Sequence, residues 1–238
     1  MAPPRPGRHR TWEGDRRTIL RGALALGVGA LAAVPLSGCA PREGQNVSSP
    51  TNKPLTPRPT VRGTPDKGTL VAYFSRAGEN YRYGGRVDLK VGNTQVVTEM
   101  IAARAAVDVY RIEAADPYPD DYEETVARNV QEEQEDVRPK IAGSLPSLRG
   151  YNRILLGSPV WNVQEPMIMR TVIEALDWTG KTVHPFVTYA VSGMGRVQDD
   201  YTRLLPGATV SDGLAIQGET VRDSLPQVSA WLRRIYLA

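Results

Sequence analysis

From residue 68 onward, short continuous apolar runs alternate with apolar residues at helical spacing. The runs lie at 70–74, 108–112, 153–157, 183–189 and 214–216, and their length and β-branched content are typical of buried strands. Helix-spaced apolar residues follow each run, near 94–105, 121–130, 166–176, 197–204 and 225–235. This alternation predicts an α/β fold, a three-layer α/β/α sandwich whose parallel sheet is covered on both faces.

The first 67 residues follow a different pattern. Residues 19–34 are an apolar run directly after Arg16-Arg17, too short for a typical spanning helix and typical of an export signal. Residues 40–67 are rich in Pro, Thr, Ser and Asn and lack apolar periodicity, which predicts a solvated tether. We therefore expect a signal peptide over 1–38, a tether over 39–67 and one domain over 68–238.

The end of the apolar run points to a lipid anchor. Leu36-Ser37-Gly38-Cys39 resembles a bacterial lipobox, and the paired arginines resemble a twin-arginine export signal. Cys39 is the sole cysteine, at the position that lipidation requires. We expect export and lipid anchoring at the outer face of the bacterial cell membrane. The alternative is an incidental cysteine near a weak membrane helix.

Charge and cysteine content narrow the function classes. The 238 residues are 41% hydrophobic and 23% charged, as in a globular protein, with a net charge of +3. Residues 68–238 hold 18 basic and 22 acidic side chains, so the excess of positive charge belongs to the N-terminal segments. The domain therefore gives no support to nucleic-acid binding. One cysteine and two histidines offer neither an intramolecular disulfide nor a transition-metal ligand set.

Three loops follow strands of the predicted sheet, where ligands of such sheets bind. The first runs from Ser75-Arg76 to Gly92-Asn93-Thr94 at a helix start, where backbone N–H groups form an anion site. The other two are residues 157–162 and 192–195.

Five motifs in these segments stand in order: Y-F-S-R at 73–76, G-N-T at 92–94, D-P-Y-P at 116–119, G-x-P-x-W at 157–161 and S-G-x-G at 192–195. Each is weak alone, but together they resemble the flavodoxin family over 68–238. The resemblance implies a five-stranded parallel sheet in the order 2-1-3-4-5 and bound FMN. It also implies one- or two-electron transfer, with the protein tuning the flavin potential.

The resemblance also assigns site residues. Ser75, Asn93 and Thr94 would donate hydrogen bonds to the FMN phosphate, whereas Pro159, Val160 and Trp161 would flank the isoalloxazine ring. Ser192, Gly193 and Gly195 would line its other side. The complete expected cofactor-binding set is Ser75, Arg76, Gly92, Asn93, Thr94, Ser158, Pro159, Val160, Trp161, Asn162, Ser192, Gly193, Met194 and Gly195.

One departure from the family pattern leaves alternatives open. Residues 77–91 intervene within the phosphate loop, as a lid over the flavin or as a surface excursion. Two phosphate-binding pieces are available, 78–80 and 92–94, and the second is preferred because it adjoins the helix start. Arg76 either assists the phosphate or is simply exposed. Trp161 stacks on the flavin or, alternatively, fills the edge of the core.

The function that follows is an FMN-binding redox protein that passes electrons between partners, which are proteins or small molecules. One alternative is an enzyme, an NAD(P)H- or quinol-dependent FMN oxidoreductase. Another is a flavin-free binding module that keeps the fold. The acidic residues at 123–136 form a solvated helix face or a docking surface for a basic redox partner.

Overall fold

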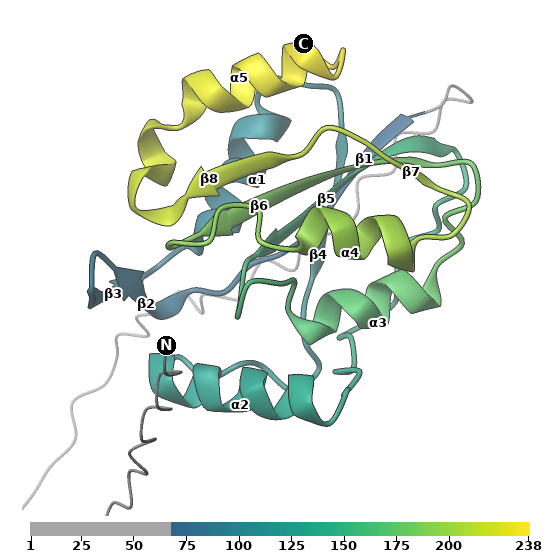
Figure 1. Ribbon diagram of the computed structural model, residues 1–238. Coiled ribbons are helices and arrows are strands. Elements are labelled where there is room, and N and C mark those ends of the chain that lie inside the picture. Colours follow the sequence, from purple (N-terminus) through teal and green to yellow (C-terminus); the bar gives the residue numbers. More distant parts are fainter. Residues whose placement is uncertain (1–67) are drawn as a thin grey trace, which may run out of the picture. The chain divides into compact units, whose positions relative to one another are not determined.

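The computed structural model describes residues 68–238, so the expectations for the signal, Cys39 and the tether lie outside the described residues. The central sheet contains β1 (Gly68–Phe74), β4 (Asp108–Ile112), β5 (Tyr151–Pro159), β6 (Thr182–Tyr189), β7 (Thr209–Val210) and β8 (Leu214–Gln217) (Figure 1). All its neighbouring strands are parallel, in the order β4-β1-β5-β6-β7, with β8 also paired to β6. The expected order 2-1-3-4-5 is thereby confirmed, with a fifth strand made of two short pieces.

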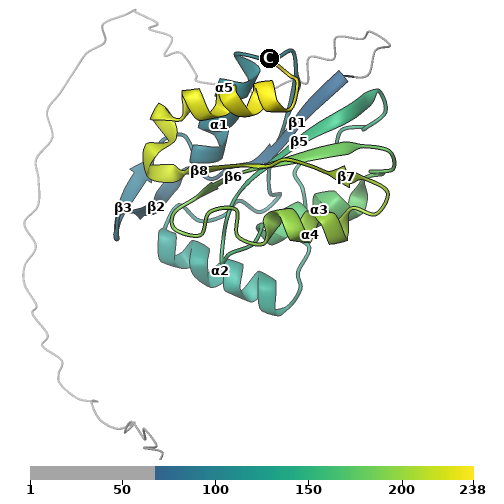
Figure 2. The ribbon, with the colours of Figure 1, turned by 45° about the horizontal axis from the view of Figure 1, so that its top comes forward.

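Helices cover both faces of this sheet. They are α1 (Asn93–Ala102), α2 (Tyr122–Gln134), α3 (Met167–Ala175), α4 (Val197–Leu204), the 3-10 helix η1 (Gly218–Asp223) and α5 (Leu225–Arg234). Figure 2 shows α1 and α5 on one side and α2, α3 and α4 on the other. Within the described part of the chain, no helix combines the length and the apolarity needed to cross a bilayer.

The strand β1 shows why the sheet is buried on both faces. Its last six residues are all buried, and the last five of them alternate between two apolar clusters. Leu70, Ala72 and Phe74 join the cluster under α3 and α4, whereas Val71 and Tyr73 join the cluster under α1 and α5. This period of two, with both sides apolar, is what a parallel strand between two helical layers requires.

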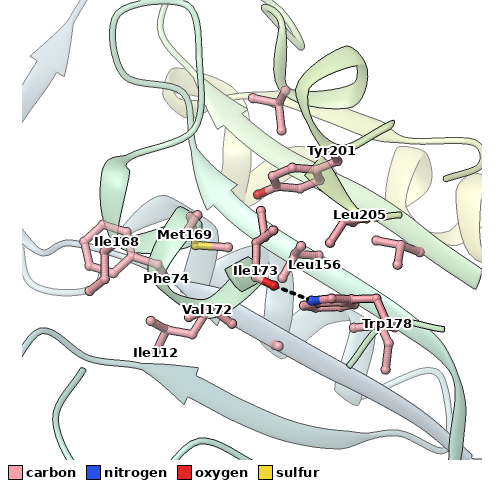
Figure 3. Packing of buried hydrophobic residues seen from close by; sticks show 14 of the residues in the cluster. Phe74, Ile112, Leu156, Ile168, Met169, Val172, Ile173, Trp178, Tyr201 and Leu205 are labelled. Atoms are coloured by element: carbon pink, nitrogen blue, oxygen red, sulfur yellow. Dashed lines mark hydrogen bonds between the residues drawn. The ribbon is translucent and has the colours of Figure 1, made fainter. Parts of the chain in front are cut away.

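The cluster under α3 and α4 contains a buried tryptophan (Figure 3). Trp178 is 4% exposed, and its Nε1 donates to the Ile173 carbonyl over 2.8 Å. The indole therefore buries a large apolar surface without leaving its N–H unpaired. Among its cluster neighbours, Val172, Tyr201 and Leu205 come from or directly follow the two covering helices.

The helix α2 departs from its expected packing. Tyr122, Val126 and Val130 share one face as the spacing predicts, but Val126 and Val130 are 39% and 38% exposed. The buried residues of α2 are Thr125, Asn129 and Glu132. Its inward face is therefore polar, and its apolar stripe remains available at the surface.

Candidate functional site

The first loop closes in space although residues 77–91 interrupt it. Ser75 Oγ accepts a hydrogen bond from the Gln95 backbone N–H in the first turn of α1 (3.1 Å). A Cβ added to Gly92 would lie 2.4 Å from both Ser75 Oγ and the Arg76 carbonyl oxygen. Only glycine permits this approach, which brings Ser75-Arg76 against the start of α1. The two halves of the predicted phosphate loop are thus rejoined.

The intervening residues form a β-hairpin of β2 (Gly78–Arg82) and β3 (Gly85–Leu89). Tyr83 and Gly84 make its turn, both with positive φ (45° and 85°), as in a type I′ hairpin. Figure 2 shows this hairpin beside the start of α2. The Glu79 backbone N–H donates to the Asp120 carbonyl over 2.7 Å.

Further contacts hold the hairpin on two sides. Arg86 Nη2 pairs with Glu123 Oε1 at 2.6 Å, and the Arg86 guanidinium lies 3.7 Å above the centre of the Tyr122 ring. At the turn, the Tyr83 N–H donates to Glu219 Oε1 of η1 (3.2 Å). The insertion is therefore a fixed wall between α2 and η1.

A pocket of about 110 Å³ opens where these elements meet the carboxyl ends of β1, β5 and β6. Seven expected residues line it: Ser75, Arg76, Asn93, Thr94, Pro159, Val160 and Trp161. Asn80, from the less favoured phosphate-binding piece 78–80, also lines it. The lining further includes residues that the motifs did not indicate: Tyr81, Tyr122, Thr188, Tyr189, Ala190, Gly218 and Glu219. The end of β6 could have suggested 188–190, because ligands bind at the carboxyl ends of strands. Apart from Asn80, the hairpin and η1 residues carry no such signal.

The Arg76 guanidinium organises the loop through backbone carbonyls. Its Nη1 donates to the carbonyls of Pro119 (2.9 Å) and Asp120 (3.1 Å), and its Nη2 donates to the carbonyl of Glu79. Burial lowers the pKa of Arg76 below its ordinary value, opposed by the nearby carboxylates of Asp120 and Asp121. Its position at the pocket edge leaves its charge near the predicted phosphate, but these N–H groups are already engaged.

Trp161 is held by two other aromatic rings. Its ring centroid lies 5.6 Å from Phe74 and 5.1 Å from Tyr118, both edge to face. Such pairs stabilise a ring by ~0.5–1.5 kcal/mol beyond its buried area. Trp161 is thus both packed against the core cluster and exposed to the pocket. Tyr118 of the D-P-Y-P motif acts as its support.

The remaining predicted residues lie around the pocket without lining it. Among the described residues, Gly92 closes the loop, Ser158 is fully buried, and Asn162 lines a neighbouring groove. The 192–195 segment packs behind the Trp161 loop, because a Cβ on Gly195 would lie 2.3 Å from the Val163 carbonyl oxygen. A Cβ on Gly213 would meet Met194 Cε at 2.5 Å. Cofactor contact by Ser192, Gly193, Met194 and Gly195 stays a prediction.

Thr94 completes the inner edge of the pocket. Its Oγ1 is hydrogen-bonded to Thr188 Oγ1 over 2.8 Å, which ties the start of α1 to the end of β6. A Cβ on Gly218 would lie 2.4 Å from Asn93 Nδ2, so η1 passes close to the same helix start. The start of α1 therefore borders a small cavity with polar side chains, and the positive end of a helix dipole suits an anion.

The fold and this loop cluster define a doubly wound α/β domain with its ligand pocket beyond the carboxyl ends of the strands. The flavodoxin family model matches residues 68–235, and the chain belongs to the flavodoxin family.

Two solved structures are similar to the chain. A Bacteroides uniformis ATCC 8492 protein, provisionally described as a flavoprotein, is 27% identical, covering 71% of this chain and 99% of that one (TM-score 0.56). A Bacteroides eggerthii DSM 20697 protein with the same description is 26% identical, covering 73% and 100% (TM-score 0.58). Comparison with curated proteins finds no significant match.

Proposed function

We propose that the chain binds FMN non-covalently in this pocket and transfers electrons between a donor and an acceptor. The observation that carries the proposal is the closure of Ser75-Arg76 against Gly92-Asn93-Thr94 at the start of α1. A phosphate dianion is stabilised by unpaired N–H groups and by the positive end of the helix dipole. The family, and the flavoprotein description of the similar structures, support the flavin.

The residues that line the pocket fit both polar parts of FMN, the phosphate and the ribityl chain. The two halves of the phosphate loop meet at Gly92, where any Cβ would fill the space. On the opposite wall, Glu219 Oε2 is buried without a hydrogen-bond partner. A carboxylate oxygen only accepts, so it suits a hydroxyl of the ribityl chain. Asn93 and Thr94 would then hold the phosphate, and Glu219 would orient the sugar alcohol.

The apolar side of the pocket suits the ring. Pro159 and Val160 follow β5, and Trp161 presents an indole that Phe74 and Tyr118 keep in place. A rigid aromatic wall excludes water from a flat ring and orders it at low entropic cost. When bound, FMN supplies one- or two-electron chemistry, and the groups around it set which redox state is favoured.

An FMN titration of the full chain, followed by absorption, tests this proposal with Gly92→Ala as the decisive variant. Wild type is expected to take up FMN, whereas the added methyl group would push Arg76 and Ser75 out of the loop. We expect at least a tenfold loss of affinity, the effect of ~1.4 kcal/mol or more. Gly85→Ala is the control, since its φ lies outside the left-handed region and a Cβ there would make only an ordinary contact, 3.5 Å from the Arg82 carbonyl oxygen. A wild-type protein that leaves added FMN unperturbed would overturn the proposal in favour of a flavin-free module.

The cellular location is part of the same proposal. The signal-like residues 1–38 and Cys39 support export and lipid anchoring at the outer face of the cell membrane. Export by a twin-arginine route suits a protein that acquires its cofactor before it crosses the membrane. The electron donor and acceptor would then be partner proteins or small molecules that reach this face.

A further inference from the structure

A second cavity, of about 260 Å³, lies beside the flavin pocket and is lined partly by the exposed stripe of α2. We call it the α2 groove. Tyr122, Val126 and Val130 come from α2, and Val160 and Trp161 come from the loop after β5. Tyr122, Val160 and Trp161 line the flavin pocket as well. A molecule in the α2 groove would therefore share walls with the flavin.

The α2 groove has an unpaired acceptor in its lining. Asn129 lines it and is 5% exposed, and its Oδ1 is buried with no hydrogen-bond partner. Its Nδ2 donates to Glu133 Oε1 over 2.8 Å. Because a carboxylate only accepts, Glu133 fixes the orientation of this amide. A buried unpaired carbonyl costs ~1–3 kcal/mol, which a ligand N–H or O–H would recover.

The same glutamate fixes the opposite wall. Asn162 Nδ2 donates to Glu133 Oε2 over 2.5 Å, so one carboxylate joins α2 to the loop after β5. Asn162 and the next residue, Val163, both have positive φ (47° and 62°), which is rare for a β-branched side chain. The α2 groove is thus held open by a specific contact between its two walls.

The charges exclude an anionic ligand. Of the described residues that line the α2 groove, Arg76 alone is charged, and its guanidinium already donates to three backbone carbonyls. A nicotinamide dinucleotide would bring phosphates that find no free cation there. The volume lies just below the ~300–1,000 Å³ of sites for drug-sized ligands.

From these features we propose that the α2 groove binds a neutral, planar aromatic molecule with a hydroxyl group, next to the flavin. The hydroxyl donates to Asn129 Oδ1, and the ring packs against Trp161 and Val126. This inference rests on the proposed function, since it places the bound molecule beside the flavin.

A matched pair of probes tests the site without redox chemistry. 2-Naphthol carries the hydroxyl, 2-methoxynaphthalene lacks the donor, and both are titrated calorimetrically into the FMN-loaded full chain. We expect 2-naphthol to bind about tenfold more tightly, because the ether leaves the Asn129 carbonyl unpaired. Asn129→Leu should abolish this preference, and Gln131→Leu, an exposed position of α2, should retain it. Equal binding of both probes to wild type, or none, would overturn the inference.

Further variants and titrations separate this inference from the flavin proposal. Val126→Glu, at a partly exposed position, should block 2-naphthol while the FMN affinity stays unchanged. Binding of 2-naphthol without any uptake of FMN would support the α2 groove as a site for hydroxylated aromatics and overturn the flavin proposal alone. FMN uptake without 2-naphthol binding would overturn the inference alone. Competition between the two would place the flavin ring in the α2 groove and overturn it as well.

Discussion

Glu165 carries a carboxyl group into the interior directly after the Trp161 loop. It is 0% exposed, and its Oε1 accepts from Arg170 Nε over 3.1 Å, while its Oε2 has no partner. Burial raises its pKa to about 7, opposed by Arg170 and reinforced by the negative charge of Asp200. A carboxyl that loses its hydration prefers the neutral form, and one arginine compensates only in part.

This shift predicts a pH-dependent stability. Below pH ~4.5 the Glu165 carboxyl is protonated in both the folded and the unfolded chain, so its full contribution to the free energy of unfolding is present. As the pH rises to about 7, only the unfolded chain releases the proton, and the fold loses stability. Glu165→Gln cannot titrate, so its free energy of unfolding should rise relative to wild type over this interval, by at most ~3 kcal/mol. Urea unfolding at several pH values measures this.

A control variant and one contrary outcome test whether the pH dependence comes from Glu165. Gln227→Ala, at an exposed position, changes no titratable group, so its difference from wild type should be the same at every pH. A difference between wild type and Glu165→Gln that stays constant from pH 4.5 to 7 would contradict the shift.

Motif residues at the site could be predicted from the sequence, whereas buried residues brought in by distant segments could not. Gly92 and Trp161 stand in ordered motifs next to strand and helix ends, so their place at the site could be predicted. Glu165 looks like any polar loop residue, and its burial arises because α4 brings Asp200 and Tyr201 over it. Such a contact between distant segments leaves no local pattern. Glu219 at the pocket was missed for the same reason.

At the scale of elements, the hairpin β2–β3 is an addition to a complete fold. It forms its own two-stranded sheet and shares no strand pairing with the central sheet. Its ends lie together, since a Cβ on Gly92 would be 2.7 Å from the carbonyl carbon of Arg76. Its contribution to the site is a wall, through Asn80 and Tyr81.

Removal of residues 78–91, which leaves Ala77 to join Arg76 to Gly92, should therefore separate folding from binding. We expect the central sheet to form with cooperative thermal unfolding, because both apolar clusters are retained apart from Val91 at the edge of one. The FMN affinity should fall by about tenfold, the effect of losing one polar and one aromatic contact. Circular dichroism and an FMN titration measure the two effects.

Tyr83→Ala changes only the 67% exposed turn and should bind FMN normally. Undiminished binding by the deletion variant would show that the hairpin is no part of the site.

The sequence predicted the strands and helices well but could not show how the insertion or α2 would pack. Residues 78–89 mix charged and aromatic side chains without a clear period, so the antiparallel hairpin has no hydrophobic signature. In α2 the valine spacing normally marks a buried face. Here Thr125 and Glu132 take the inward positions, and Tyr118 donates its hydroxyl to Glu132 Oε2 over 2.8 Å. A polar network behind the Trp161 loop thus displaced the expected apolar contact.

For the whole molecule, charge divides the chain into two parts. Residues 68–238 carry 18 basic and 22 acidic side chains, whereas the preceding residues hold the remaining 11 basic and 4 acidic ones. A basic segment ahead of an apolar run is the charge pattern of an export signal. The acidic domain would then be the part that meets donors and acceptors beyond the membrane.

This division yields a prediction about Cys39. If it is lipidated, cells grown with an alkyne-tagged fatty acid should label the wild-type protein, and Cys39→Ala should lose the label entirely. The loss should be complete because the chain has no other cysteine to which the lipid could attach. Ser48→Ala in the expected tether is the control and should be labelled like wild type.

One lipid chain binds a membrane only marginally, so stable anchoring requires at least two. Intact mass of the mature protein should therefore show removal of residues 1–38 and the added mass of more than one acyl chain. Label that persists on Cys39→Ala would refute the anchor, while the FMN proposal for residues 68–238 would stand unchanged.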